Sequence, residues 1–137
     1  HHASSAASDV YKRQYMVSGE LEPVSHYCHV VKAGGFVWLS GMVGMKADGT
    51  IPEGTVEQFE IALKTIDTCL REAGGKPNQI VKVQIFMTDI SERSSINPIR
   101  IEYFGDHKPA STLVEVSALV DPRMRVEIEA VAYIDDK

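Results

Sequence analysis

Alternation between apolar and polar side chains predicts most of the strands in this chain. Residues 80–89, 108–119 and 125–134 each carry an apolar residue at nearly every second position, a pattern typical of strands that bury one face. Residues 27–31 and 36–40 are rich in β-branched and aromatic residues, and the KAGG segment between them predicts a hairpin turn. These five segments are therefore expected to form a sheet.

A period of three to four residues predicts two helices. The first begins at Thr55, which is followed three residues later by Gln58, the spacing of a capping box, and it ends before Gly74. Its apolar stripe consists of Val56, Phe59, Leu63, Ile66, Leu70 and Ala73. The second helix is expected over residues 95–104. Pro98 is tolerated there because the first helical turn has no partner for its missing N–H.

These elements predict a single α+β domain over residues 15–137. Their order is β-β-α-β-α-β-β, with room for a further short strand near residues 15–20. Two helices and a mixed sheet indicate that both helices pack on one face of the sheet and leave the other face free. Residues 1–14, HHASSAASDVYKRQ, show no hydrophobic period, and we interpret them as a tag remnant and a cloning junction outside the fold.

The free face of the predicted sheet carries a mixture of side chains. Because residues two positions apart on a strand share a face, the apolar rows of the last two strands are assigned to the helices. The other rows are assigned to the free face and contain Ser111, Leu113, Glu115, Ser117, Arg125, Glu127, Glu129, Val131 and Tyr133, joined by Phe86. This face is too apolar to be fully solvated and too charged to be a core. A subunit interface with a polar cleft fits both properties, and the alternative is a solvated face with scattered apolar residues.

The composition narrows the class of protein. The chain has 137 residues, of which 44% are hydrophobic, and its formal net charge is −5. No segment is long and apolar enough to cross a membrane, and the scattered Lys and Arg argue against a nucleic-acid partner. Cys28 and Cys69 indicate neither a disulfide framework nor a metal site, which favours a reducing compartment such as the cytoplasm. His26 and His29 lack a third ligand, so no metal is expected.

Six motifs spread along the chain resemble one protein family. They are LSGMVG (39–44), the AGG that ends the first helix, VKVQIFMTDI (81–90), INPIRIEYF (96–104), KPASTLVEVSAL (108–119) and VEIEAVA (126–132). Together they make the chain from Tyr27 to Ile134 similar to the reactive intermediate deaminase (Rid, or YjgF) family. The resemblance implies a chorismate-mutase-like fold, a homotrimer, and clefts between neighbouring subunits that are lined by the helix-free face.

The resemblance also implies a reaction and a set of residues. The best-known members hydrolyse reactive enamines and imines to ketoacids and ammonia without a cofactor. Carried over position by position, the catalytic acidic residue is Glu127, and a carboxyl group suits proton transfer because partial burial raises its pKa toward neutrality. The positions that contact the substrate are Tyr27, Ser40, Gly41 and Asn97.

Each of these substrate-binding positions has a structural alternative. Tyr27 could be an interface aromatic that hydrogen-bonds its hydroxyl group. Ser40 could simply end a strand, and Gly41 could allow close approach of a ligand or of another backbone. Asn97 could cap or brace the second helix.

One stretch departs from the family pattern. The deaminases carry an arginine in a P-A-R-[ST] motif that grips the substrate carboxylate, and Ser111 stands at that position here. Leu113 stands where family members use a cysteine. A hydroxyl group cannot neutralise a carboxylate, so the usual carboxylated imines are expected to be poor substrates. Arg125 is a candidate replacement, although pairing with Glu115 or Glu129 is the favoured interpretation.

Three functions are consistent with this pattern. The first is a cofactor-free hydrolase or deaminase for imines, enamines or a related small electrophile that is neutral or anchored differently. The second is a non-catalytic trimer that binds a small molecule or another protein. The third is a ribonuclease, which the acidic net charge disfavours.

Overall fold

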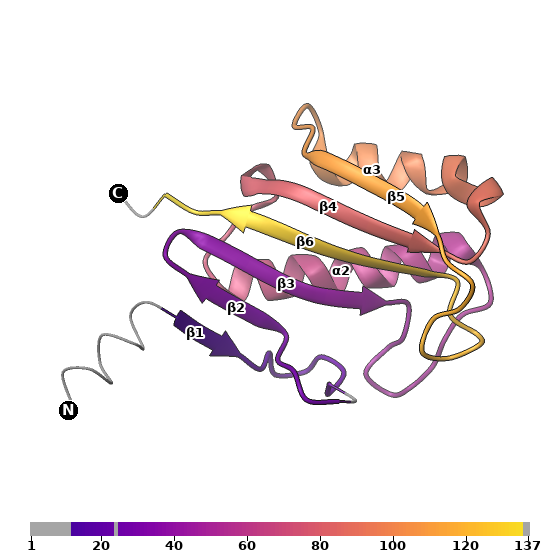
Figure 1. Ribbon diagram of the computed structural model, residues 1–137, viewed down its shortest axis with the longest axis horizontal. Helices are drawn as coiled ribbons and strands as arrows, with labels where there is room; N and C mark the ends of the chain where they lie inside the picture. Colours follow the sequence, from indigo (N-terminus) through magenta and orange to yellow (C-terminus); the bar gives the residue numbers. More distant parts are fainter. Residues whose placement is uncertain (1–11, 24, 136–137) are drawn as a thin grey trace.

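Six strands and two α-helices form two layers in the computed structural model, which describes residues 12–23 and 25–135 (Figure 1). The strands are β1 (Lys12–Tyr15), β2 (Val30–Ala33), β3 (Phe36–Val43), β4 (Ile80–Met87), β5 (Ala110–Glu115) and β6 (Val126–Tyr133). The helices are α2 (Thr55–Glu72) and α3 (Asn97–Phe104), with short 3-10 helices η1 (Pro77–Gln79) and η2 (Ile90–Ile96). In the sheet the strand order is β1-β2-β3-β6-β4-β5.

The sheet is mixed, as the sequence predicts. Every neighbouring pair is antiparallel except β4 and β5, which are parallel. The η2–α3 segment connects these two strands, because parallel neighbours require a crossover rather than a tight turn. Both helices lie behind the sheet in Figure 1 and leave its near face open. The α+β class, the order of the elements and the placement of both helices on one face are therefore confirmed.

The core lies between the sheet and α2. In β6 every second residue is buried, and the intervening Glu127, Glu129, Val131 and Tyr133 face away from the helices as expected. The buried residues of α2 are Thr55, Gln58, Phe59, Ala62, Leu63, Ile66, Cys69 and Leu70. Most of the predicted stripe is confirmed, but Val56 is exposed and Cys69 is buried instead. Burial raises the pKa of the Cys69 thiol to about 12, so this group stays protonated.

The predicted capping box at the start of α2 is wrong, because both of its residues serve tertiary contacts. Gly54 occupies the N-cap position, and no side chain caps the helix. The buried amide of Gln58 donates to the carbonyl oxygens of Pro52 (2.7 Å) and Arg123 (2.9 Å). Its oxygen accepts from the backbone N–H of Arg125 (2.8 Å). Gln58 therefore ties the segment before α2 to the segment that enters β6.

The parallel pairing of β4 and β5 corrects the expected orientation of β5. Ser111 pairs with Val83, which is buried beneath the helices. Leu113 pairs with the buried Ile85 and packs against the core. Residues paired across neighbouring strands lie on the same face, so Ser111 and Leu113 lie on the helix side and not on the free face. The alternating pattern predicted the wrong face because β5 is an edge strand. Neither of its faces is deeply buried, and Val114 on the free face is exposed although it is apolar.

The strand β1 begins at Lys12, inside the segment that the sequence alone assigns to a tag remnant and a cloning junction. β1 pairs with β2 through Lys12–Tyr15, so residues 12–14 belong to the sheet and the boundary at residue 14 is corrected. Residues 1–11 lie outside the described residues. Within the described part, neither α-helix is long and apolar enough to span a membrane.

Gly44, the residue directly after β3, lies against the backbone of α2, and this contact predicts a stability effect. A Cβ atom at Gly44 would lie 2.4 Å from Cα of Gln58 and 2.3 Å from its Cβ. The backbone of α2 would have to move, so Gly44→Ala is expected to lower the free energy of unfolding by about 1–3 kcal/mol. Urea unfolding followed by circular dichroism measures this. The matched control is Gly41→Ala in β3, where the three atoms nearest to the added Cβ all belong to the flexible Glu127 side chain. Equal losses in the two variants would contradict the prediction.

Candidate functional site

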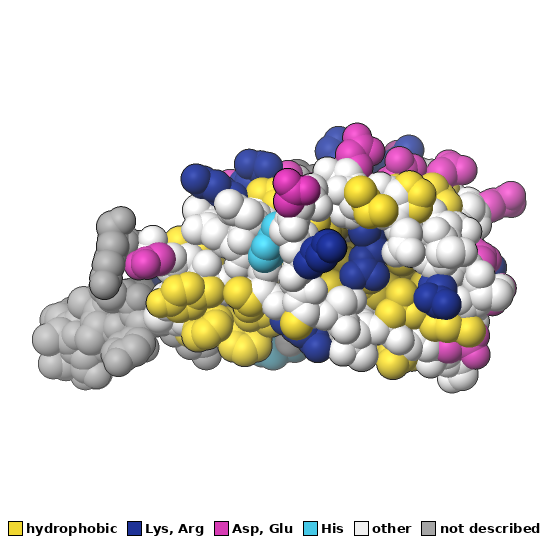
Figure 2. Space-filling model, turned by 90° about the horizontal axis from the view of Figure 1, so that it is seen from above, with side chains coloured by type: hydrophobic (Ala, Val, Ile, Leu, Met, Phe, Trp, Pro, Cys, Tyr) yellow, Lys and Arg dark blue, Asp and Glu magenta, His cyan; other side chains and the backbone are white. Residues whose placement is uncertain are grey.

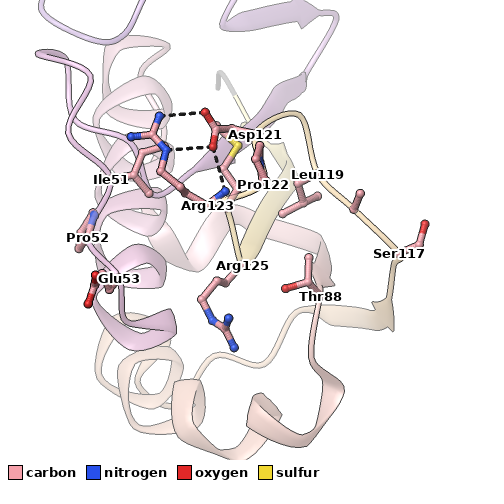
Figure 3. A pocket seen from close by; sticks show the side chains of 12 residues that line it. Ile51, Pro52, Glu53, Thr88, Ser117, Leu119, Asp121, Pro122, Arg123 and Arg125 are labelled. Carbon is pink, nitrogen blue, oxygen red and sulfur yellow. Dashed lines mark hydrogen bonds and ion pairs between the residues drawn. The ribbon is translucent and has the colours of Figure 1, made fainter.

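Two cavities share a wall at the loop that precedes β6. Asp121 and Met124 line both of them. The first has a volume of about 530 Å³ and is drawn in Figure 3. Two of its charged groups pair with each other: the Arg123 side chain donates to Asp121 through Nε (3.0 Å) and Nη2 (2.9 Å). Arg125 is also engaged, as described next.

Arg125 does not join the predicted catalytic group. Its Nε donates to Oγ1 of Thr55 (2.7 Å), and its Nη2 pairs with Glu92. In Figure 3 its guanidinium points away from the Asp121–Arg123 pair. The expected pairing of Arg125 with Glu115 or Glu129 is therefore wrong, because η2 brings Glu92 closer than either strand residue. Glu115 instead accepts from the backbone N–H of Ile90 (2.9 Å).

The second cavity gathers four of the predicted site residues, and we call it the Glu127 cavity. Its volume is about 500 Å³, and Tyr27, Ser40, Gly41 and Glu127 all line it. The rest of its wall is formed by Leu21, Ser25, Val43, Met45, Val120, Asp121 and Met124. Residues from three separate parts of the sequence are thus brought to one mostly apolar cavity.

A β-bulge positions two of these residues. Leu39 pairs with Ala130 and Met42 with Ile128, so Ser40 and Gly41 together face a single residue of β6. A bulge of this kind bends its strand and redirects side chains, and bulges are common beside functional sites. The Ser40 hydroxyl donates to the carbonyl oxygen of Cys28 (2.6 Å), and the Ser40 N–H donates to that of His29 (3.0 Å). These bonds hold the segment that carries Tyr27 against the bulge.

The carboxyl group of Glu127 lies directly over Gly41. A Cβ atom at Gly41 would be 2.0 Å from Oε2 of Glu127 and 2.9 Å from Cδ. Only glycine therefore leaves room for the carboxyl group in this position. Within the described residues, Glu127 makes no hydrogen bond or ion pair, so its oxygens are available to a molecule in the cavity.

The surroundings of Glu127 make it easier to protonate. Burial raises the pKa of its carboxyl group above the ordinary value of 4.5, and the negative charge of Glu129 raises it further. A partly buried carboxyl group with a raised pKa exchanges its proton closer to neutral pH than an exposed glutamate does, which suits it to general acid–base catalysis.

Tyr27 and His26 are exposed, whereas the nearby His29 is buried. Tyr27 is 45% exposed at the rim of the cavity, and His26 beside it is exposed. His29 is buried: its Nδ1 accepts from the N–H of Val17 and its Nε2 donates to the carbonyl oxygen of Leu21, both at 2.8 Å. His29 therefore has a structural role in anchoring residues 17–21.

The remaining predicted residues lie elsewhere in the same chain. Asn97 is the first residue of α3, and Ser111 and Leu113 lie on the helix side of the edge strand β5. The Glu127 cavity is formed at β3 and β6, and β4 separates β6 from β5. One copy of the chain does not bring these two groups into one cavity.

Sequence reasoning missed one residue at the β5 edge. Nη2 of Arg100 in α3 donates to Oγ of Ser111 (2.9 Å). Arg100 lies three residues after Asn97, so helical spacing places both on one side of α3, and a cavity next to α3 is lined by both. That spacing is visible in the sequence, but the contact with Ser111 depends on how α3 packs. Among the described residues, no group of three His, Cys, Asp or Glu side chains could hold a metal ion.

The raised pKa of Glu127 predicts a pH-dependent difference between the parent and Glu127→Gln. The folded parent keeps this proton to higher pH than the unfolded chain, so its stability falls as pH rises above the ordinary value of 4.5. Glutamine has no such titration, so the variant should gain stability relative to the parent toward neutral pH. Thermal unfolding midpoints from about pH 4 to about pH 8 measure the gap. A midpoint difference, variant minus parent, that is constant across this range or that decreases as pH rises would rule out the raised pKa.

Comparisons with known proteins agree with this architecture. The sequence profile of the family described as Endoribonuclease L-PSP matches residues 17–134. A RutC family protein of Aquifex aeolicus is 41% identical over 113 residues, which cover 80% of this chain and 90% of the relative. A Mus musculus protein described as 2-iminobutanoate/2-iminopropanoate deaminase is 34% identical over 112 residues, covering 80% of this chain and 82% of the relative.

A solved structure extends the likeness to three dimensions. The crystal structure of a Yersinia pestis protein, described as a protein of unknown function of the conserved Rid protein family, superposes with a TM-score of 0.85. It is 32% identical and covers 90% of this chain and 99% of its own. The expected chorismate-mutase-like fold is thereby confirmed. With a family profile that spans residues 17–134 and relatives similar over most of their length, the chain belongs to the endoribonuclease L-PSP family, which includes the Rid (YjgF) proteins.

Proposed function

We propose that this protein is a cofactor-free hydrolase that converts small reactive imines or enamines into carbonyl compounds and ammonia. The observation that carries the proposal is the half-buried, unpaired Glu127 carboxyl group held over Gly41 in a mostly apolar cavity. The relative described as a 2-iminobutanoate/2-iminopropanoate deaminase supports the choice of substrate class. The free thiols of Cys28 and Cys69 support a reducing compartment such as the cytoplasm.

Hydrolysis of a C=N bond requires three proton transfers when the imine enters protonated. The oxygen of water adds to the imine carbon and the π electrons move to the protonated nitrogen, while the Glu127 carboxylate accepts one proton of the water, which gives a neutral carbinolamine. Glu127, now a carboxylic acid, returns that proton to the nitrogen. The C–N bond then breaks as the C=O bond forms, ammonia leaves, and the Glu127 carboxylate accepts the hydroxyl proton of the carbinolamine. A raised pKa makes both forms accessible closer to neutral pH.

The complete site in this proposal lies between two copies of the chain. Tyr27, Ser40, Gly41 and Glu127 line one cavity, whereas Asn97, Ser111 and Leu113 lie at the β5 edge. An assembly in which the β5 edge of one copy covers the Glu127 cavity of the next would join them. The trimer that we propose closes such contacts into a ring of three equivalent clefts.

The exposed aromatic side chains of the free face support this assembly. Phe36, Trp38 and Tyr133 are 43%, 50% and 46% exposed. They form one cluster, since the ring of Phe36 lies 6.1 Å from that of Trp38 and 5.0 Å from that of Tyr133. A contiguous aromatic patch on a sheet face is typical of an interface between subunits.

The two alternative functions explain the cavity and its carboxyl groups less completely. A non-catalytic binding trimer would explain the cavity but would not need an unpaired carboxyl group with a raised pKa. A ribonuclease would bring a phosphate chain to the cavity, where the carboxyl groups of Asp121 and Glu127 would repel it. Turnover of an imine separates the hydrolase from both.

A trimer is the first expected outcome. Light scattering on the purified protein at micromolar concentration should give three chains per particle. Trp38→Glu places a charge within the aromatic cluster and should dissociate the particle, because the charge would be buried at the interface without a partner. Val56→Glu on the outer side of α2 is the control and should leave the trimer intact. A parent that stays monomeric would remove the cleft from the proposal.

Loss of hydrolysis in Glu127→Gln is the second expected outcome. Glutamine keeps the shape but cannot move a proton, so the rate should fall about a hundredfold or more. The assay follows ammonia release from imines made in place, by an amino-acid oxidase for carboxylated imines and by an amine oxidase for uncharged ones. Each rate is compared with spontaneous hydrolysis. An intact Glu127→Gln trimer with the parent's rate would make Glu127 a structural residue, and a parent no faster than the blank would refute the hydrolase.

Displacement of the carboxyl group should have a similar effect. Gly41→Ala leaves Glu127 in the chain but moves its carboxyl group out of the position over the bulge. We expect a fall in rate of roughly a hundredfold with little change in unfolding free energy, since Glu127 can swing away. Activity assays and urea unfolding on the same preparation test this. Full activity in Gly41→Ala would show that the position over the bulge is irrelevant.

A further inference from the structure

Arg100 is a half-buried arginine without a counter-charge in the described part of the chain. Its contact is the hydrogen bond from Nη2 to the neutral Ser111 hydroxyl (2.9 Å), and no described carboxylate pairs with it. Three other arginines do pair with carboxylates: Arg71 with Asp67, Arg123 with Asp121 and Arg125 with Glu92. Arg100 therefore stands apart from these three.

The position of Arg100 has an electrostatic cost. Burial lowers the pKa of its guanidinium group, which is the expected direction for a cation withdrawn from water. The group nevertheless remains charged at neutral pH. A hydroxyl group satisfies one of its N–H donors but does not offset the charge. An anionic ligand at this place would supply the missing partner.

The surroundings of Arg100 favour an anion. A cavity of about 170 Å³ adjoins it, lined by Asn97, Ile101, Phe104, Gly105, His107, Lys108 and Pro109, with no acidic side chain among them. His107 is already engaged, because its Nε2 donates to the carbonyl oxygen of Ile80 (2.6 Å). Figure 2 looks onto this side of the molecule from above α3 and β5, and it shows Lys and Arg side chains at the centre of the face and acidic ones mainly along its rim.

The geometry of the guanidinium selects the kind of anion. Arginine presents five N–H donors in a planar fork, and Ser111 occupies one nitrogen. The remaining edge matches the two oxygens of a carboxylate in a bidentate pair. The cavity is small, and Lys108 adds a second positive charge to its lining without a second fork, so the flat edge of one guanidinium favours a carboxylate head group over a phosphate.

We propose that Arg100 binds the carboxylate of the substrate, with Ser111 holding the guanidinium in place and Asn97 beside it. This inference rests on the proposed function, in which the β5 edge of one copy covers the Glu127 cavity of the next. It revises the expectation that carboxylated imines are poor substrates, because that expectation considered position 111 without the arginine that α3 brings to it.

Binding of a product-like carboxylate tests the site directly. The probes are 2-oxobutanoate, uncharged 2-butanone and inorganic phosphate, titrated into the intact protein and followed calorimetrically or by ligand-observed NMR. Arg100→Gln should weaken 2-oxobutanoate binding about tenfold to a hundredfold, the usual range for a charge-assisted pair, and leave 2-butanone unchanged. Arg93→Gln removes an equal charge from an exposed position on η2 and should change neither. The affinity of Arg100→Lys for 2-oxobutanoate should lie between those of the parent and Arg100→Gln, because lysine keeps the positive charge but lacks the planar fork of donors.

A variant that carries the guanidinium on β5 instead of α3 distinguishes a binding role of Arg100 from a structural one. In the double variant Arg100→Gln/Ser111→Arg, the guanidinium is supplied from β5 instead of α3. This variant should recover at least part of the 2-oxobutanoate affinity that Arg100→Gln loses. Unfolding midpoints of all variants are measured in parallel. A loss of affinity in Arg100→Gln that follows only from a lost fold or trimer, with no recovery in the double variant, would overturn the proposal.

The kinetic experiment distinguishes failure of this inference from failure of the proposed function. Arg100→Gln should raise KM for the carboxylated imine about tenfold or more and leave the uncharged imine unaffected. If imines are hydrolysed but Arg100→Gln leaves the KM for the carboxylated imine at the parent value, the hydrolase proposal is supported and the carboxylate site is refuted. If no imine is hydrolysed while 2-oxobutanoate binds through Arg100, the carboxylate site is supported and the hydrolase proposal is refuted. Tighter binding of phosphate than of 2-oxobutanoate through Arg100 would overturn the choice of a carboxylate.

Discussion

The β-bulge at Ser40 and Gly41 is the constraint on which the candidate site depends. Two residues of β3 face one residue of β6 there, so the backbone bends and Gly41 lies beneath the neighbouring strand's Glu127. Without a Cβ at position 41, the carboxyl group can lie over the backbone, partly withdrawn from water and close to Glu129. The same bend lets Ser40 anchor the segment that carries Tyr27. One local irregularity thus sets the position, the exposure and the acidity of the proposed proton carrier.

The contacts of α2 hold that bulge in register. Gly44 lets β3 pack against the backbone of Gln58, and the Gln58 side chain bonds to both segments that frame the start of β6. Since Glu127 is the second residue of β6, any movement of that entry point would move its carboxyl group. A fully buried amide with all its bonds to backbone atoms is well suited to this task, because breaking any of them would leave a buried polar group without a partner.

The division of the candidate site between two parts of the surface links chemistry to assembly. The proton-handling group lies on the free face and the proposed anion-binding group lies at the opposite side of the edge strand. In the proposed trimer, a substrate that needs both groups binds where two copies meet, so the stability of the assembly and the activity should rise and fall together. In the proposed carboxylate site Ser111 orients Arg100, because the hydrogen bond from the guanidinium to the strand hydroxyl fixes the side chain.

Much of this protein was determined by the sequence itself, and the exceptions share a physical reason. Hydrophobic periodicity predicted α2, β4 and β6 with their buried faces, because each has one face against the core. The motifs grouped Tyr27, Ser40, Gly41 and Glu127, which line one cavity in the structure. Three features needed the tertiary structure. The face of β5 was mispredicted because an edge strand buries neither face strongly. Gln58 serves distant backbone groups instead of a cap, and Arg100 reaches Ser111 only because the η2–α3 crossover lays the helix across the parallel strand. Periodicity reports burial within one element, whereas partners between elements depend on how those elements pack.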